Sequence, residues 1–295
     1  MEPVTHALSG VLVGRLSPKD RAVFWASLVS SIAPDLDYVS RFWGVGQFLR
    51  FHRGITHGIF ALLIVPILVG LIFGRGKKFL KIFFFSFFSY GLHIFLDLTN
   101  SYGTRLISPL DWQPYALNLV FPIDIYIGIL LLGGIIISYT GKRHSALSAV
   151  ITIFLLFGYI GGKYYLKIET EEFLRQRLPT EITKVYPLPN GLLRWWVVAK
   201  KDGEFRTGLS DIFMRKVFLS EPYPPLSDDP AIEQSKKGAK AFLDIAGSPY
   251  PIVKRDGDSV EVIWKDLAHD FLPGERFTAR VLIENGKIKR TYFKL

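Results

Sequence analysis

Four long stretches without an ionised side chain constrain the fold of this chain more than any other feature. They are residues 58–74, 82–96, 125–141 and 145–162. Each approaches the roughly 20 apolar residues that an α-helix needs to cross a bilayer. Buried helices of a large soluble protein would still show a polar face, which these stretches lack. The sequence therefore predicts four membrane helices, and Pro66 is expected to kink the first.

The composition agrees with a membrane protein and argues against several other classes. Hydrophobic residues make up 49% of the 295 residues, and the net charge is +10. A basic chain can bind nucleic acid, but many basic residues here sit in short loops beside apolar stretches, where membrane orientation explains them. We therefore expect membrane lipids and no nucleic acid as partners. The absence of cysteine excludes a disulfide framework, a thiolate zinc site and a cysteine nucleophile.

The segments around the four stretches complete the predicted domain organisation. Two short helices are expected at 4–16 and 20–33, at or partly within the bilayer. The fold class is thus an α-helical integral membrane domain, with about four membrane helices plus two short N-terminal helices, followed by a small soluble α+β or β-rich domain. The predicted boundaries are 1–165 for the membrane domain, 166–185 for a linker helix and 186–295 for the soluble domain.

Turn signals organise the predicted soluble domain. Asp202–Gly203 separates two alternating stretches at 194–200 and 204–209, and Asn285–Gly286 separates 277–283 from 287–293. Both patterns indicate β-hairpins, the second with a type I′ turn. Asp229 and Pro230 are expected to open a helix that extends to Phe242, and Ser259–Trp264 is expected to be another strand.

Basic residues between the stretches indicate an orientation. They are Arg75, Lys77, Lys78 and Lys81 in the first connection and Lys142 and Arg143 in the third. The positive-inside rule places these connections in the cytoplasm. Segment 52–57, loop 98–121 and the soluble domain would then lie outside it. Residues 1–57 also carry six basic side chains, which complicates this assignment. We expect a multi-pass protein of a bacterial or archaeal inner membrane.

Histidines and aspartates gather at the ends of the apolar stretches. They are His6, Asp35, Asp37, His52, His57, His93 and Asp97. His93 and Asp97 are four residues apart, so on a helix they share a face and can share a metal ion. Asn100, Ser101, Thr104 and Arg105 follow, and they are suited to holding an anionic group. His144 and His269 are expected to be surface residues.

A set of imidazoles and carboxylates without cysteine suits Zn, with Mn or Fe as alternatives, and one or two ions. Each residue also has an ordinary structural explanation. A histidine can pack in a core or cap a helix, and a carboxylate after a helix can accept hydrogen bonds in a turn. Ionisable groups beside membrane helices are costly, however, and the whole set favours a functional site.

The order of the motifs resembles a known family. Thr5-His6, Pro34-Asp35-Leu36-Asp37, His52-Arg53-Gly54-Ile55-Thr56-His57 and His93 through Arg105 together look like a bacterial family of inner-membrane, predicted metal-dependent hydrolases, some of them regulated by LexA. The resemblance covers residues 1–165 and implies metal-dependent hydrolysis.

That family is similar in turn to zinc-dependent phospholipase C in the order of its ligand motifs. The resemblance implies metal-ligand roles for His6, Asp35, His52 or His57, His93 and Asp97. This chain has no match to a further His-(three residues)-Glu pair that those phospholipases use. A third metal and a phospholipid substrate are therefore not implied.

In the expected mechanism, a metal-activated water attacks a phosphodiester or another ester. The expected substrate is lipid-linked or lipid-like. Arg53 and Arg105 would neutralise the anionic substrate, although both arginines are also explained by anchoring at the membrane surface. Asp37 or Asp124 would orient a ligand or accept a proton. The alternatives are a non-catalytic metal-binding protein, a transporter, whose ionisable residues would lie at mid-membrane, and a scaffold with a structural metal.

Overall fold

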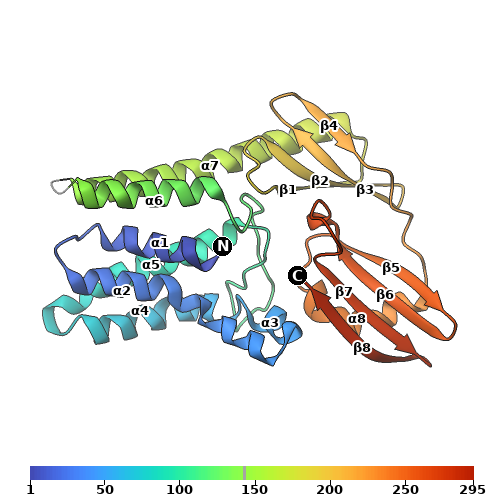
Figure 1. Cartoon of the computed structure of the whole chain (residues 1–295), viewed down its shortest axis with the longest axis horizontal. Coiled ribbons are helices and arrows are strands. Elements are labelled where there is room, and N and C mark those ends of the chain that lie inside the picture. The colour runs from blue at the N-terminus through green and yellow to red at the C-terminus, as the bar shows by residue number, and fades with distance from the viewer. Residues whose placement is uncertain (142–143) are drawn as a thin grey trace. The chain divides into compact units, whose positions relative to one another are not determined.

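The computed structural model describes residues 1–141 and 144–295. The chain forms two compact units (Figure 1). The first contains Met1–Ser40 and Phe51–Tyr164, and the second contains Arg41–Arg50 and Tyr165–Leu295. The first unit is helical, and the second contains all the strands that are named below.

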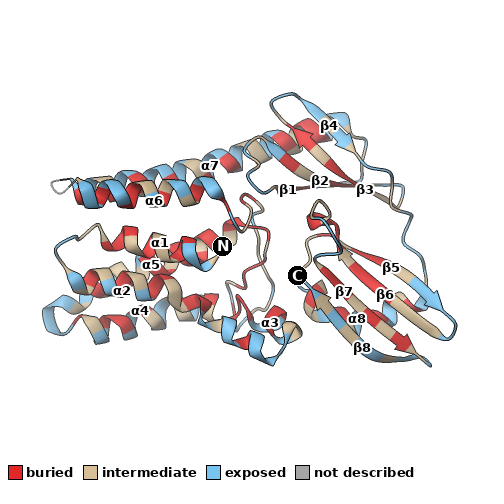
Figure 2. Cartoon of the chain, in the orientation of Figure 1, coloured by how far each residue is buried: buried red, intermediate tan, exposed pale blue. Residues whose placement is uncertain are grey.

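Helices form most of the described chain from Pro3 to Arg177, apart from the connections between them, of which 100–124 is the longest. In order they are α1 (Pro3–Gly14), α2 (Arg21–Ile32), the 3₁₀ helix η1 (Ala33–Trp43), α3 (Val45–Phe51), η2 (Ile55–His57), α4 (Ile59–Phe73), η3 (Gly76–Lys78), α5 (Phe79–Thr99), α6 (Ile125–Thr140) and α7 (Ser145–Arg177). The two short N-terminal helices are present as α1 and α2. Figure 2 and the exposed fractions show that α4 and α7 leave many apolar side chains uncovered, as lipid-facing helices do.

The prediction of four membrane helices is wrong in its number. Among the described residues, two helices are long and apolar enough to cross a membrane, Gly76–Thr99 and Ser145–Arg177. A third span is possible if Val45–His57 and Ile59–Phe73, bent by 63°, count as one broken span. Helix α6 has 16 residues, which reach about 24 Å, short of a hydrocarbon core of about 30 Å.

The shorter helices have local causes. Helix α4 begins only at Ile59, because Gly58 breaks the chain away from η2. Helix α6 begins where the Asp124 carboxylate accepts hydrogen bonds from the Tyr126 and Ile127 amides, and it ends at Gly141. Pro66 lies inside α4 as expected. By contrast, α5 extends past the predicted 82–96 at both ends, and Lys81 in its first turn pairs with Asp20 at 3.0 Å.

Helices α2 and α5 run parallel and carry candidate ligands at the same end. Near their starts, Lys81 contacts Asp20, and near their ends the His93 ring contacts the Ser31 carbonyl. Helix α1 packs closely on α2, because a Cβ at Gly10 would lie 2.0 Å from Ser31 Oγ. The histidine and aspartate positions of α1, η1 and α5 are thereby brought to one end of the helices.

Hydrogen bonds join three connections at the other end of the helices. Arg15, at the C-terminus of α1, donates to Ser138 and Ser145, and Lys81 donates to Ser17. The turns after α1, α4 and α6 therefore lie together, opposite the candidate ligands. Lys142 and Arg143, two of the basic residues that predict the orientation, lie outside the described residues.

The second unit contains two four-stranded antiparallel sheets. The first is β1 (Ile182–Pro187), β2 (Arg194–Lys201), β3 (Glu204–Asp211) and β4 (Lys216–Leu219); the second is β5 (Pro249–Asp256), β6 (Ser259–Asp266), β7 (Thr278–Glu284) and β8 (Lys287–Lys294), in sequence order. Helix α8 (Pro230–Leu243) precedes the second sheet, and the 3₁₀ helix η4 (Leu267–His269) follows β6. The expected linker range 166–185 holds the end of α7 and the start of β1.

Turn chemistry was a reliable guide in this unit. Asp202–Gly203 and Asn285–Gly286 form the turns of the β2–β3 and β7–β8 hairpins, and all four residues have positive φ, as type I′ turns require. Asp229 caps α8 as predicted. His269 was wrongly expected at the surface. It is buried, stacks on Phe277 and contacts Asp266 at 3.1 Å.

The buried Asp266 supports a prediction about acid stability. Burial alone would raise its pKa, but bonds from His269 and from the amides of Ser248 and Ala268 outweigh burial and hold the pKa below its usual value. A carboxylate whose pKa is lower in the folded protein than in the unfolded chain stabilises the fold at pH values above the unfolded-state pKa. This contribution is lost as the pH falls through the folded-state pKa. We expect Asp266→Asn to destabilise by about 1–3 kcal/mol at pH 7 and by less at pH 3.

Thermal unfolding at the two pH values, followed by circular dichroism, measures this effect. Asp258→Asn, at an exposed position in a turn, is the control and should change little at either pH. An equal loss for Asp266→Asn at both pH values would contradict the assignment.

Candidate metal centre

Four buried side chains meet at one end of the first unit. Asp35 lies on η1 just after α2, His57 lies on η2, and His93 and Asp97 lie one turn apart on α5. Their ligand atoms all lie within 4.8 Å of one another. The side chains of His57, His93 and Asp97 are fully buried. Three separate stretches of sequence thus converge on a compact group of nitrogen and oxygen atoms.

The distances within this group match those between the ligands of one ion. His57 Nε2 lies 3.2 Å from His93 Nε2 and 3.1 Å from Asp97 Oδ2. His93 Nε2 lies 3.6 Å from Asp97 Oδ2 and 3.7 Å from Asp35 Oδ1. Ligands of a tetrahedral zinc site with bonds of 2.0–2.1 Å are about 3.3 Å apart. The four atoms are therefore already close to the spacing of such a site.

Hydrogen bonds on the far sides of both rings determine which nitrogens carry protons. His93 Nδ1 lies 2.7 Å from the Ser31 carbonyl oxygen, which can only accept, so Nδ1 is the donor. The Thr56 hydroxyl donates to Asp37 at 2.7 Å, and His57 Nδ1 lies 3.0 Å from that hydroxyl oxygen and 3.4 Å from Asp37. His57 Nδ1 is therefore a donor as well. In the neutral rings both Nε2 atoms carry lone pairs, and these face each other.

This arrangement fits a cation better than it fits an apoprotein core. Two imidazole lone pairs and two carboxylate oxygens face one another in a buried volume, and such groups repel unless a positive charge lies among them. Among the described residues, Asp35 Oδ2 and Asp97 Oδ2 also have no hydrogen-bond donor. Burial raises the pKa of Asp35 to about 6. The donor set therefore fits a divalent metal ion with nitrogen and oxygen ligands.

Asp37 and His52 form an adjoining group. Asp35, Asp37 and His52 also have potential ligand atoms within 4.8 Å of one another, so Asp35 belongs to both groups. His52 Nδ1 lies 2.7 Å from Asp37 Oδ1. Burial would raise the pKa of Asp37, but its hydrogen bonds with His52 and His57 hold that pKa well below its usual range. Asp37 therefore fixes the orientation of two histidines, a common arrangement around metal ligands.

His6 lies beside the four-residue group. Its ring stacks on His93 with 3.6 Å between ring centroids, and Nε2 lies 3.1 Å from Asp97 Oδ1. That oxygen also contacts the Met1 amino nitrogen. His6 thus occupies one oxygen of Asp97 and leaves the other to face His57 and His93.

Arg53 is bound largely by protein groups. Its Nη2 lies 2.9 Å from Asp97 Oδ1, and its Nη1 donates to Asn100 Oδ1 at 2.9 Å and to the Tyr102 carbonyl at 2.6 Å. Its backbone has φ of 56°, and its amide donates to Asp37 at 2.9 Å. These contacts indicate that Arg53 holds Asp97 and the following loop in place, a different task from the expected neutralisation of substrate.

The remaining expected residues lie in different surroundings. Arg105 is buried, and its Nη1 donates to the His52 carbonyl at 3.2 Å. The Asp124 carboxylate caps α6 and accepts from the Tyr159 hydroxyl at 2.9 Å. These contacts favour a structural role for Asp124. Among the described residues, the Asn100 amide nitrogen and the Tyr102 hydroxyl have no hydrogen-bond partner.

Comparison with known sequences assigns the helical part of the chain to a protein family. The sequence model of the YdjM inner membrane protein family matches residues 1–168. The chain belongs to the YdjM inner membrane protein family. It is also 29% identical over 213 residues to the uncharacterized protein YfhP of Bacillus subtilis (strain 168), an alignment that covers 68% of this chain and 64% of YfhP. No solved structure matches the chain.

The YdjM region contains the entire cluster, since every candidate ligand precedes residue 168. The family and the apolar helices agree on an inner-membrane protein. The resemblance noted from the motifs is thereby confirmed at the level of the inner-membrane family.

Sequence reasoning missed several residues that shape this YdjM site. Thr56 and the Ser31 carbonyl fix the tautomers of His57 and His93. Tyr102 lies under Arg53, with 5.1 Å from the guanidinium carbon to the ring centroid. Thr56 lies within the His52–His57 motif, so the sequence could have indicated its role. A backbone carbonyl such as that of Ser31 cannot be recognised from the sequence.

A change at Asp37 tests whether the orientation of His52 and His57 matters, and it removes no ligand of the four-residue group. We expect Asp37→Ala to weaken metal affinity by about 10–100-fold, because His52 and His57 lose the acceptor that fixes them. Competition with a chromogenic chelator measures the affinity. Asp111→Ala, a change in the loop after the site, should leave it unchanged. Equal affinities for Asp37→Ala and wild type would contradict the orienting role.

Proposed function

We propose that this chain is a membrane-bound metal-dependent hydrolase that acts on a phosphodiester or another ester. The observation that carries the proposal is the buried group of His57 Nε2, His93 Nε2, Asp97 Oδ2 and Asp35 Oδ1, whose lone pairs face one another without a donor between them. One ion fits this group, and a second ion could share Asp35 with Asp37 and His52. Ligands without sulfur favour Zn first, then Mn or Fe.

The residues of the chain have distinct tasks in this proposal. A divalent ion held by the group supplies Lewis-acid charge and lowers the pKa of a water molecule. Asp37 orients His52 and His57, while Arg53 and His6 hold one oxygen of Asp97. The unpartnered donors of Asn100 and Tyr102 are suited to the anionic oxygens of a substrate. Arg105 adds positive charge close to His52.

A catalytic metal and a structural metal lead to different expected results in an activity assay. The purified protein loaded with Zn²⁺ or Mn²⁺ should hydrolyse bis(p-nitrophenyl) phosphate or a short-chain phospholipid, and His57→Ala should reduce the rate to background. Stoichiometric metal binding without turnover of phosphodiester or carboxylic ester substrates would instead favour the non-catalytic alternatives. The location of the group at helix ends already disfavours a transporter, whose ionisable groups would line a path at mid-membrane.

We also infer that the metal-group end faces away from the cytoplasm. The three turns at the opposite end hold most of the exposed or partly exposed basic residues of the helical unit, Arg15, Lys19, Arg21, Arg75, Lys77, Lys78 and Lys81. The positive-inside rule places that end in the cytoplasm. The basic residues of segment 15–21, which complicated the sequence argument, therefore support the same orientation.

The lack of cysteine makes this orientation directly testable. Gln113→Cys, in the exposed part of loop 98–121, should react with a membrane-impermeant maleimide in intact cells. Lys77→Cys should react only after the membrane is permeabilised. The reverse pattern of labelling would place the metal group on the cytoplasmic side.

A further inference from the structure

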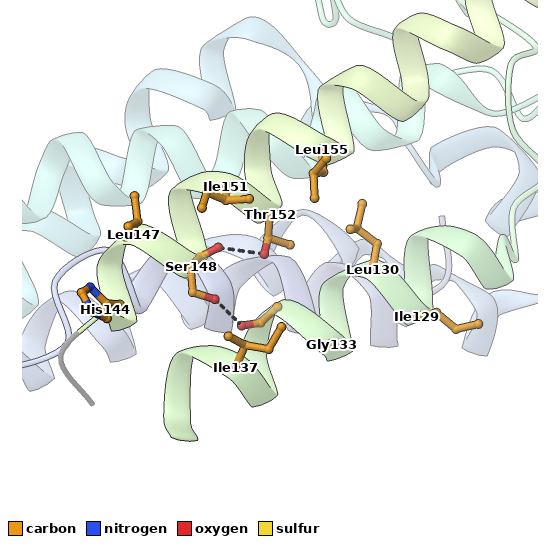
Figure 3. Close-up of a pocket in the computed structure, with 11 residues that line it drawn as sticks. Ile129, Leu130, Gly133, Ile137, His144, Leu147, Ser148, Ile151, Thr152 and Leu155 are labelled. Carbon is orange, nitrogen blue, oxygen red and sulfur yellow. Dashed lines mark hydrogen bonds between the residues drawn. The ribbon is translucent and has the colours of Figure 1, made fainter. Parts of the chain in front are cut away.

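An apolar groove runs between α6 and α7, from Ile129 near the start of α6 to His144 just before α7 (Figure 3). Its volume is about 420 Å³. The aliphatic lining is Ile129, Leu130, Ile137, Leu147, Ile151 and Leu155, and His144 lies at one end. A groove of this kind on membrane helices needs an occupant from the bilayer or from another chain.

Two neighbouring glycines explain why the groove exists. A Cβ at Gly134 would lie 2.1 Å from Thr152 Oγ1, so the glycine allows α6 and α7 to touch there. A Cβ at Gly133 would have no heavy atom within 4 Å, so this position is open. The close contact forms the floor, and the missing side chain of Gly133 leaves the space above it.

The interior of the groove offers hydrocarbon contacts. Its two hydroxyls are used within the protein, because Ser148 donates to the Gly134 carbonyl at 3.1 Å and Thr152 donates to the Ser148 carbonyl at 2.8 Å (Figure 3). An occupant therefore gains nothing from polar groups along the walls. An acyl chain meets this requirement.

The end of the groove has the opposite character. His144 is exposed just before α7, and Arg15 binds Ser138 and Ser145 at the same end. The neighbouring turns carry further basic residues, with Lys81 close to Ser17. Basic sites between membrane helices attract anionic lipid head groups. Two copies of this chain in one membrane have the same orientation, so symmetric pairing here would bring like charges together.

We propose that the α6–α7 groove binds an anionic phospholipid, with an acyl chain along the groove and the phosphate beside His144 and Arg15. This site is separate from the metal group and does not depend on the proposed hydrolase activity. Its His144 end lies opposite the metal group, so its lipid is a bound structural partner and is distinct from a substrate at the metal group.

Gly133→Trp tests the groove, and Gly128→Trp is a matched control. Both glycines lie open on α6, but only Gly133 lines the groove. After delipidation, phosphatidylglycerol or phosphatidylcholine is added back, and native mass spectrometry counts the bound lipid. We expect wild type and Gly128→Trp to retain phosphatidylglycerol, and Gly133→Trp to retain about tenfold less, because the indole fills the space of the chain.

His144→Glu tests the head-group end and should reduce the preference for phosphatidylglycerol over phosphatidylcholine. Equal retention by wild type and Gly133→Trp would overturn the proposal, as would equal binding of the two lipids by wild type. A lipid-free wild-type dimer that Gly133→Trp dissociates would also overturn it and would assign the groove to a second copy of the chain.

Discussion

Excess EDTA is expected to lower the midpoint of thermal unfolding of the purified protein by about 5–10 °C, and added Zn²⁺ should restore it. The reason is the buried contact between the lone pairs of His57 and His93 beside Asp97. An ion at this position is bound by the folded protein and by little of the unfolded chain. At a hundredfold excess over its dissociation constant, such an ion adds about 2.7 kcal/mol of stability.

His93→Ala is the control for this effect. The variant lacks one ligand of the group, so EDTA and Zn²⁺ should change its unfolding midpoint by much less than that of wild type. His144→Ala, at an exposed position far from the group, should respond as wild type does. An unfolding midpoint of wild type that neither EDTA nor any divalent metal alters would count against an ion in the group.

Arg53→Met is expected to cost about 3 kcal/mol of stability when the metal has been removed. The guanidinium is buried and compensates Asp97 at 2.9 Å, and it joins Asn100 to the Tyr102 carbonyl. Methionine keeps much of the volume but leaves a buried carboxylate with less compensation. The left-handed backbone at this position is no harder for methionine than for arginine.

Chemical or thermal unfolding of Arg53→Met beside Arg50→Met measures the effect. Arg50 is exposed and only three residues away, so its loss should change stability by less than about 0.5 kcal/mol. If Arg53 instead served mainly to bind substrate, its replacement would raise KM and leave the unfolding free energy near that of wild type.

The candidate ligands were predictable because each lies where an apolar stretch ends. Asp35, His57, His93 and Asp97 follow this pattern, and their types already suggested a metal without sulfur ligands. Their division of tasks was not predictable. Asp35 and Asp37 look alike in the sequence, yet Asp37 bonds His52 and the Arg53 amide, while one oxygen of Asp35 has no donor among the described residues.

The helix lengths were less predictable than the apolar stretches. The stretches 58–74 and 125–141 form the helices Ile59–Phe73 and Ile125–Thr140. Each of these helices is too short to cross the membrane alone, so four stretches became at most three spans. In the second unit, local turn chemistry predicted both hairpins, because type I′ turns require positive φ at both central residues and Asp-Gly and Asn-Gly adopt it readily. The burial of His269 depends on Asp266 and Phe277, and sequence spacing alone did not reveal that environment.

The most direct test of the metal centre is the metal content of the purified protein, measured by inductively coupled plasma mass spectrometry for wild type, His93→Ala and Asp97→Ala. The structure leads us to expect one Zn, Mn or Fe ion per chain in wild type, or two if Asp35 is shared, and a clear loss in both variants. Wild-type protein that contains no such ion after purification without chelator, and takes up none on addition, would contradict a metal centre at this group.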